Sequence, residues 1–233
     1  MGKVSPALAL YLLSSLIYVL SVALHWDELI TFLFKPMMMP AILFYYFQEN
    51  KGNVNFFAIL VLVLFFAGDM LILIEVDSLL APLMLINLSA YLIIGFFLVR
   101  DLLLVKNPQI SAYMIAIICL VICFLLSLLY VALKLIFDKS DANYELLTVY
   151  GIVLFLLSLG TVFLHLIKGD TSAFYLAITM LCLVLCDLFY VLYNYYMKLP
   201  VFININVFLQ SISFYFIVKY FLSRTESNLI SEF

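Results

Sequence analysis

Three ionisable side chains lie inside apolar runs that are long enough to cross a bilayer. They are Lys35 in LITFLFKPMMMPAILFYYF, Asp69 in FFAILVLVLFFAGDMLILI and Asp187 in AFYLAITMLCLVLCDLFYVLYNYY. A charge at that depth costs several kcal/mol unless it is paired, neutralised or hydrated. These three residues are therefore the first candidates for a functional site.

The composition indicates that the solvent of this chain is lipid. Of the 233 residues, 68% are apolar and only 11% are charged, whereas about a quarter of a soluble domain is charged. The polar residues are confined to short clusters between apolar stretches. We therefore predict a single integral membrane domain over residues 1–233, in the cell membrane, with membrane lipids as its surroundings and no role in binding nucleic acid.

Apolar runs of about 20 residues, the length that a helix needs to cross the hydrocarbon core, occur eight times. Barrel strands are shorter and alternate, and nothing here alternates. We therefore predict an all-α, polytopic bundle of eight transmembrane helices. The predicted spans are Pro6–Leu24, Leu29–Gln48, Val54–Ile74, Leu79–Val99, Ile110–Phe137, Glu145–Ile167, Ala173–Tyr195 and Val201–Leu222.

The first span ends in Ser21-Val22-Ala23, which resembles a signal-peptide cleavage site. Its apolar stretch is longer than the usual apolar core of a signal peptide, so we expect a retained helix. With eight spans, both termini lie on one side of the membrane. By the positive-inside rule, the distribution of basic residues predicts that this side is the cytoplasm. The terminal side collects Lys3, Lys51, Arg100, Lys106, Lys168, Lys219 and Arg224, and the other side only Lys134, Lys139 and Lys198.

This topology brings the three ionisable residues to the same depth. At 1.5 Å per residue, Lys35 lies roughly 9 Å, Asp69 roughly 8 Å and Asp187 roughly 12 Å inside the outer boundary. We therefore predict a polar cavity that opens toward the outer leaflet, above an inner half packed by apolar residues. Other polar residues at similar depth are Asn87, Glu145, Tyr150, Asn194, Asn204, Asn206 and Gln210.

The seventh span carries a possible extension of this site. Asp187, Tyr190 and Asn194 are spaced i, i+3 and i+7, which places them on one face of an ideal helix.

Each of these features has a purely structural alternative. Lys35 has a flexible stem that could reach the interface as an anchor. Asp69 or Asp187 could be a neutral acid that only joins helices, and the asparagines of the eighth span could do the same. Pro36 and Pro40 could open a kink beside Lys35 or only shape the packing.

Four cysteines repeat at i, i+4, as Cys119 with Cys123 and Cys182 with Cys186. Each pair shares a helix face, but Leu, Val and Ile flank all four and no histidine is near. We interpret them as small buried residues that fill the core, and predict neither a metal site nor a cofactor.

Four short motifs together resemble the YhhN family, the membrane lysoplasmalogenases. They are Lys35-Pro36, Gly68-Asp69, Val149-Tyr150 and Asp187 after its apolar run, and the resemblance spans essentially the whole chain. Two positions depart from the family pattern. The family pattern has a histidine three residues before the tyrosine that corresponds to Tyr91, and this chain has Leu88 there. In the last span, Gln210 and Phe214 stand where the family has a polar pair.

The resemblance implies hydrolysis of the vinyl ether bond of a lysoplasmalogen, a lysophospholipid. The products are a fatty aldehyde and a glycerophospho-headgroup compound. Two buried carboxyls suit this chemistry, because a protonated one can protonate the β-carbon and an ionised one can stabilise the oxocarbenium ion. We assign these roles to Asp69 and Asp187, in either order. Lys35, Tyr150, Tyr190 and Asn194 would bind the substrate and its water.

The competing interpretation is a proton-coupled carrier or a lipid-binding protein without catalysis, because two acids and a lysine in a bundle also describe these. A carrier should show polar residues that continue to the cytoplasmic side, since alternating access needs a path through both halves. The inner halves are mostly Leu, Ile, Val and Phe. This pattern favours a one-sided site. Oligomeric state has no signature in the sequence.

Overall fold

The computed structural model describes residues 5–50, 54–73, 80–105, 110–137 and 144–231. Within these residues the chain forms eight α-helices, each long and apolar enough to cross a membrane, and no β-strand. The predicted all-α, multi-pass architecture is thus confirmed. The helices are α1 Pro6–Ala23, α2 Glu28–Glu49, α3 Phe56–Leu73, α4 Leu80–Leu103, α5 Ala112–Phe137, α6 Tyr144–Lys168, α7 Thr171–Val191 and α8 Pro200–Ser231.

Several helix starts follow from local sequence chemistry. Ser5, Asp27 and Asp170 precede α1, α2 and α7, and each side chain accepts a hydrogen bond from a backbone N–H in the first turn. Pro6 occupies the first position of α1, where its missing N–H costs nothing.

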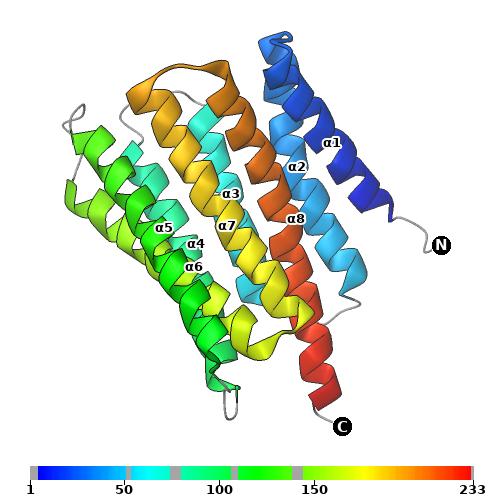
Figure 1. Ribbon diagram of the computed structural model, residues 1–233. Helices are drawn as coiled ribbons and strands as arrows, with labels where there is room; N and C mark the ends of the chain where they lie inside the picture. Colours follow the sequence, from blue (N-terminus) through cyan, green and yellow to red (C-terminus); the bar gives the residue numbers. More distant parts are fainter. Residues whose placement is uncertain (1–4, 51–53, 74–79, 106–109, 138–143, 232–233) are drawn as a thin grey trace.

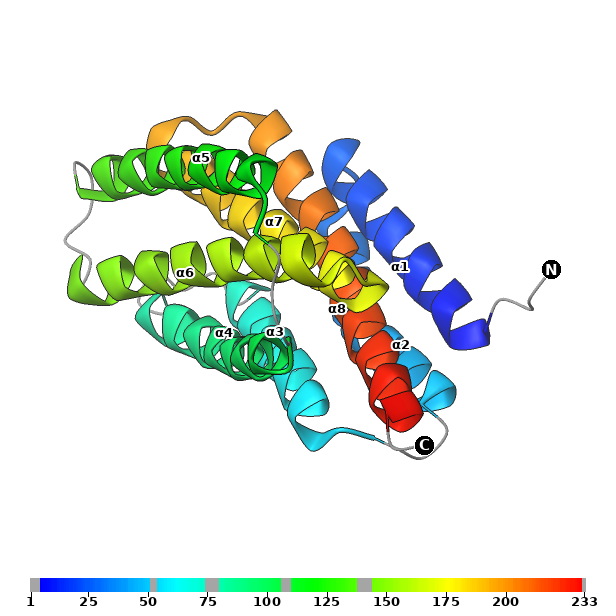
Figure 2. The ribbon, with the colours of Figure 1, turned by 60° about the horizontal axis from the view of Figure 1, so that its bottom comes forward.

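The helices form two groups on either side of a central pair (Figure 1). α7 and α8 pack along each other, α1 and α2 cover one side of them, and α4, α5 and α6 lie on the other. α3 lies between α2 and α4 and also touches α8. Figure 2 shows α5 at the periphery, where it packs against α6, α7 and the turn after α7. Side chains for one buried site can therefore come from helices far apart in sequence.

α1 begins and α8 ends at the same end of the bundle (Figure 1). We call the other end, at which α1 passes into α2 and α7 into α8, the site end. Which end faces the cytoplasm remains a prediction.

The cysteine prediction is correct for only one pair. Cys182 and Cys186 are buried on the central helix α7, whereas Cys119 and Cys123 are exposed on α5. The interpretation of Cys119 and Cys123 as core residues is wrong, because α5 is a peripheral helix whose outer face is available to lipid.

A buried ion pair joins α4 to α8 at the end opposite the site end. Arg224 Nε lies 2.8 Å from Asp101 Oδ1, and the two side chains are 7% and 3% exposed. Tyr220 Oη donates to Asp101 Oδ2 at 2.7 Å, and the guanidinium lies 4.8 Å from the centre of the Phe97 ring. Both helices continue past their predicted ends, which is how Asp101 and Arg224 come to be helical and buried.

We predict that removal of one partner of this pair destabilises the protein. An Arg224→Met variant leaves the Asp101 carboxylate buried without its cation, which typically costs about 3–5 kcal/mol. The double variant Asp101→Leu, Arg224→Met should recover much of that loss, because it buries no lone charge. Thermal unfolding of both variants in detergent micelles measures the difference. A single variant as stable as the native protein would contradict this account.

Candidate functional site

Asp69 lies in the last turns of α3 and is 6% exposed. Gln210 Nε2, from α8, donates a hydrogen bond to Asp69 Oδ1. The preceding Gly68 lets α3 approach α4, because a Cβ there would lie 2.7 Å from Asn87 Oδ1. The carboxyl group of Asp69 is therefore satisfied by a neutral donor from a helix about 140 residues later in the chain.

Lys35 is buried at 7% exposure on α2 and does not reach the surface. Its Nζ lies 5.9 Å from the centre of the Tyr18 ring of α1, a cation–π arrangement. Asp69 is within electrostatic range of Lys35, yet the ion pairs among the described residues do not include these two. The alternative interpretation of Lys35 as an interfacial anchor is wrong, because the cation points into the bundle.

Asp187 accepts hydrogen bonds from two phenols on two other helices. Tyr150 Oη of α6 lies 2.7 Å and Tyr91 Oη of α4 lies 3.3 Å from Asp187 Oδ2. The two hydroxyls are 3.5 Å apart, and the two ring centres 5.6 Å. Both tyrosines are buried, whereas Asp187 is partly exposed. Asp187 Oδ2 thus accepts both hydrogen bonds, and Oδ1 takes no part in them.

Cys186 lies near all three ionisable residues. Its buried thiol is within electrostatic range of Asp187, Asp69 and Lys35. Asn206 of α8 fixes this turn of α7, since its Nδ2 donates to Cys186 O at 2.7 Å and approaches Cys186 Sγ at 3.1 Å. The three ionisable residues therefore lie in one region of the bundle, and Asn206 joins α8 to α7, as the structural alternative for the asparagines of the eighth span expected.

Asn194 does not join Lys35, Asp69 and Asp187. The residues after α7, Leu192–Tyr196, form a π-helical turn, and Asn194 is exposed with its Nδ2 bonded to Tyr190 O at 2.9 Å. A π turn has more residues per turn than an α-helix, so the i+7 extrapolation from Asp187 fails there. Tyr190 is partly buried one turn after Asp187, and its backbone carbonyl is the group that Asn194 contacts.

Sequence reasoning missed Tyr18 as a residue of the site. The signal was present, because the buried residues of α1 form a polar stripe with helical spacing. They are Tyr11, Ser14, Ser15, Tyr18 and Ser21. Tyr11 Oη in this stripe donates to Ser211 O of α8. The sequence analysis names Tyr91 only as a position of the family pattern, and Gln210 only as such a position and as a polar residue at the depth of the ionisable residues. It could not name the hydrogen-bond partners of either side chain.

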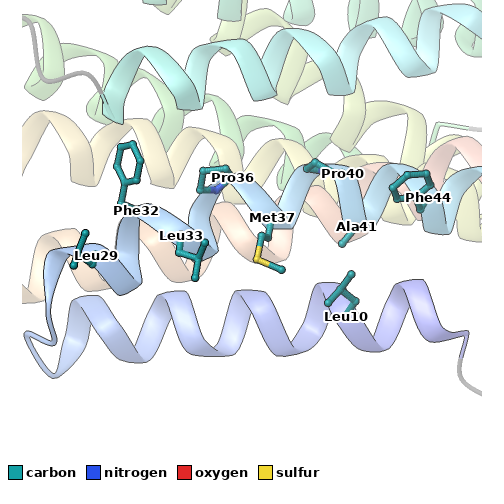
Figure 3. A pocket seen from close by; sticks show the side chains of 9 residues that line it. All are labelled: Leu10, Leu29, Phe32, Leu33, Pro36, Met37, Pro40, Ala41 and Phe44. Atoms are coloured by element: carbon teal, nitrogen blue, oxygen red, sulfur yellow. The ribbon is translucent and has the colours of Figure 1, made fainter.

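Figure 3 shows an apolar groove along α2, of about 690 Å³. Pro36 and Pro40 contribute to its lining, and α2 remains helical through both prolines. Lys35 is not among the lining residues, which are Leu10, Leu29, Phe32, Leu33, Pro36, Met37, Pro40, Ala41 and Phe44. The two prolines thus contribute to an apolar outer surface of α2.

These features define a multi-pass helical membrane protein with a buried lysine, a buried carboxyl group and a partly exposed carboxyl group in one region of the bundle. Among the described residues, no group of three or more His, Cys, Asp and Glu side chains could hold a metal ion. Searches against protein-family models, curated proteins and solved structures find no match for the chain.

We predict that the Tyr150 hydroxyl stabilises the protein more than the Tyr91 hydroxyl. A Tyr150→Phe variant removes the shorter hydrogen bond to Asp187 and should cost about 1–3 kcal/mol of the free energy of unfolding. A Tyr91→Phe variant should cost less, because its bond is longer and Tyr150 remains. The matched control is Tyr130→Phe, on the exposed face of α5. Equal unfolding midpoints for all three variants would contradict the assignment.

Proposed function

We propose that this protein is an intramembrane hydrolase that cleaves the vinyl ether bond of lysoplasmalogens. The products are a fatty aldehyde and a glycerophospho-headgroup compound. The observation that carries the proposal is the pair of carboxyls, Asp69, which is buried, and Asp187, which is partly exposed. Each is held by neutral donors from other helices, and both lie with Lys35 within electrostatic range of Cys186.

Charge balance supports different roles for the two carboxyls. A buried site with one lysine is neutral overall when one carboxyl is ionised and the other protonated, and low-dielectric surroundings favour that state. Lys35 is the cation within electrostatic range of Asp69, whereas the polar groups that contact Asp187 are the two phenols. We therefore assign the ionised form to Asp69, because a cation lies near it. Asp187 is the proton carrier, with its proton on Oδ1, because Oδ2 already accepts from Tyr150 and Tyr91.

In the proposed reaction, Asp187 protonates the β-carbon of the vinyl ether and becomes a carboxylate. The oxocarbenium ion that forms is stabilised by the Asp69 carboxylate, and a water molecule adds to its α-carbon. Loss of a proton from that water to Asp187 restores the acid and leaves a hemiacetal. The hemiacetal collapses to the aldehyde and the free glycerol hydroxyl, so one water is consumed per bond cleaved.

Two further considerations support this substrate class. The resemblance to the YhhN family includes Lys35, Asp69, Tyr150 and Asp187, four residues that lie at the site. A lysophospholipid is also a substrate that reaches a site among membrane helices directly from the lipid. We further propose that the protein resides in the cell membrane with both termini in the cytoplasm, so that the site opens toward the outer leaflet.

The test is release of fatty aldehyde from a lysoplasmalogen by the purified full chain in detergent. Asp69→Asn and Asp187→Asn should each abolish release, because one removes the counter-charge of the cation and the other removes the proton donor. Asp170→Asn, at the cap of α7, is the matched control and should retain activity. An active Asp187→Asn variant that elutes as folded protein would refute the assigned role of Asp187.

A proton-coupled carrier is the second candidate, and one observation favours it. The Asp101–Arg224 pair with Tyr220 is a second buried polar cluster, at the other end of the bundle. Between this cluster and the site, the described helices carry buried apolar side chains, which include Phe65, Ile94, Phe214, Ile217 and Val218.

These apolar side chains lead us to expect that protons do not cross the protein. Proteoliposomes containing the native chain and a pH-sensitive dye should therefore show no proton flux above that of empty vesicles when lipid substrate is added. Substrate-dependent flux, lost in Asp69→Asn, would replace the hydrolase by a carrier.

A further inference from the structure

The ammonium group of Lys35 is placed differently from those of the other described lysines. Lys168 Nζ lies 2.8 Å from Asp170 Oδ2, and Lys219 Nζ donates to Tyr45 Oη at 2.7 Å. Lys134 is exposed. Lys35 alone in this set is buried with a carboxyl group within electrostatic range but outside direct contact. Its nitrogen is therefore not locked into an ion pair.

We propose that Lys35 binds aldehydes covalently, as a Schiff base between its Nζ and the carbonyl carbon. Amine nucleophiles of this kind are lysines held away from bulk water. Long-chain aldehydes are chosen as the ligand class because they are the product of the proposed function, and in this choice the inference rests on that function. The chemistry of Lys35 itself does not depend on it.

The surrounding groups supply each step of the reaction. The Lys35 ammonium passes one proton to the Asp69 carboxylate through an intervening water molecule, and the amine lone pair attacks the aldehyde carbon. A proton moves from nitrogen to the former carbonyl oxygen, which gives a carbinolamine. Asp69 returns its proton to that hydroxyl, the C–O bond breaks, water leaves, and the nitrogen lone pair forms the C=N bond. One aldehyde and one ammonium thus become one protonated imine and one water.

The protonated imine is stabilised by two groups already in place. Asp69 is again a carboxylate after the water has left, so it serves as the counter-ion. The Tyr18 ring, whose centre lies 5.9 Å from Lys35 Nζ, attracts the imine cation as it attracts the ammonium. Gln210 holds Asp69 Oδ1 and so leaves the other carboxylate oxygen for proton transfer. The bundle accordingly retains an aldehyde in the region that contains both carboxyl groups.

The experiment adds hexadecanal to the purified full chain in detergent, reduces any imine with borohydride and maps the modified lysines by peptide mass spectrometry. We expect a hexadecyl group on Lys35 at several-fold higher occupancy than on the exposed Lys134. Lys35→Arg keeps the charge and should lose this adduct while the others persist. Lys219→Arg, the matched control, should leave the Lys35 adduct unchanged.

A higher adduct occupancy on the exposed Lys134 than on the buried Lys35 would overturn the inference. The absence of a Lys35 adduct in the folded native chain would overturn it too. Because the aldehyde is supplied directly, an adduct can form in a protein that does not hydrolyse lysoplasmalogen. Hydrolysis without an adduct would leave the proposed function intact and refute the covalent site alone.

Discussion

A carboxyl group in hydrocarbon must find its hydrogen-bond partners within the protein, and the arrangement of this bundle depends on that constraint. Hydrocarbon offers no hydrogen bonds, so donors from other helices have to reach Asp69 and Asp187. Gln210 of α8 does so for Asp69, and Tyr150 of α6 with Tyr91 of α4 for Asp187. The two acids thereby connect five of the eight helices.

α1 and α2 are joined to α8 by polar contacts as well. Association of helices in lipid gains little from the hydrophobic effect, because lipid tails are as apolar as leucine, and packing with polar contacts has to replace it. α1 shows this clearly. Its buried face is a stripe of serines and tyrosines rather than of leucines, and its Tyr11 bonds a carbonyl of α8. The leucines of α1 lie on the exposed face, where Leu12, Leu13 and Leu16 are available to lipid.

Composition and run length predict the eight helices well, because each span must be apolar for about 20 residues whatever its neighbours are. Counting residues from the helix ends also predicts that Lys35, Asp69 and Asp187 share a depth. The partners are another matter. Which of the polar residues on α8 meets Asp69 depends on helix rotation, and the chain offers Asn204, Asn206 and Gln210 within two turns. Asn206 donates a hydrogen bond to the backbone of α7, and Gln210 donates one to Asp69. The spacing of these residues in the sequence does not predict which of them makes which contact.

Local backbone geometry limits the sequence argument in a second way. An ideal helix carries Asp187, Tyr190 and Asn194 on one face, but the π turn at Leu192–Tyr196 changes the rotation after Val191 and leaves Asn194 exposed. π turns arise from single local shifts in hydrogen bonding and have no strong sequence signature. Exposure in a membrane protein is equally hard to predict, because lipid-facing and buried surfaces are both apolar. Cys119 and Cys182 therefore look alike in sequence although only one of them is buried.

The polar residues divide the bundle into two chemically different ends, and this division bears on mechanism. Asp101 and Arg224 are in direct contact, with Tyr220 on the second carboxylate oxygen, so the charges of that cluster are already satisfied by each other. Lys35 and Asp69 are close without such contact, and Asp187 holds both phenols on one oxygen. A carboxyl or amine that is not held in a direct ion pair is better placed to exchange a proton with a ligand. The proposed chemistry therefore belongs to the end that contains Asp187.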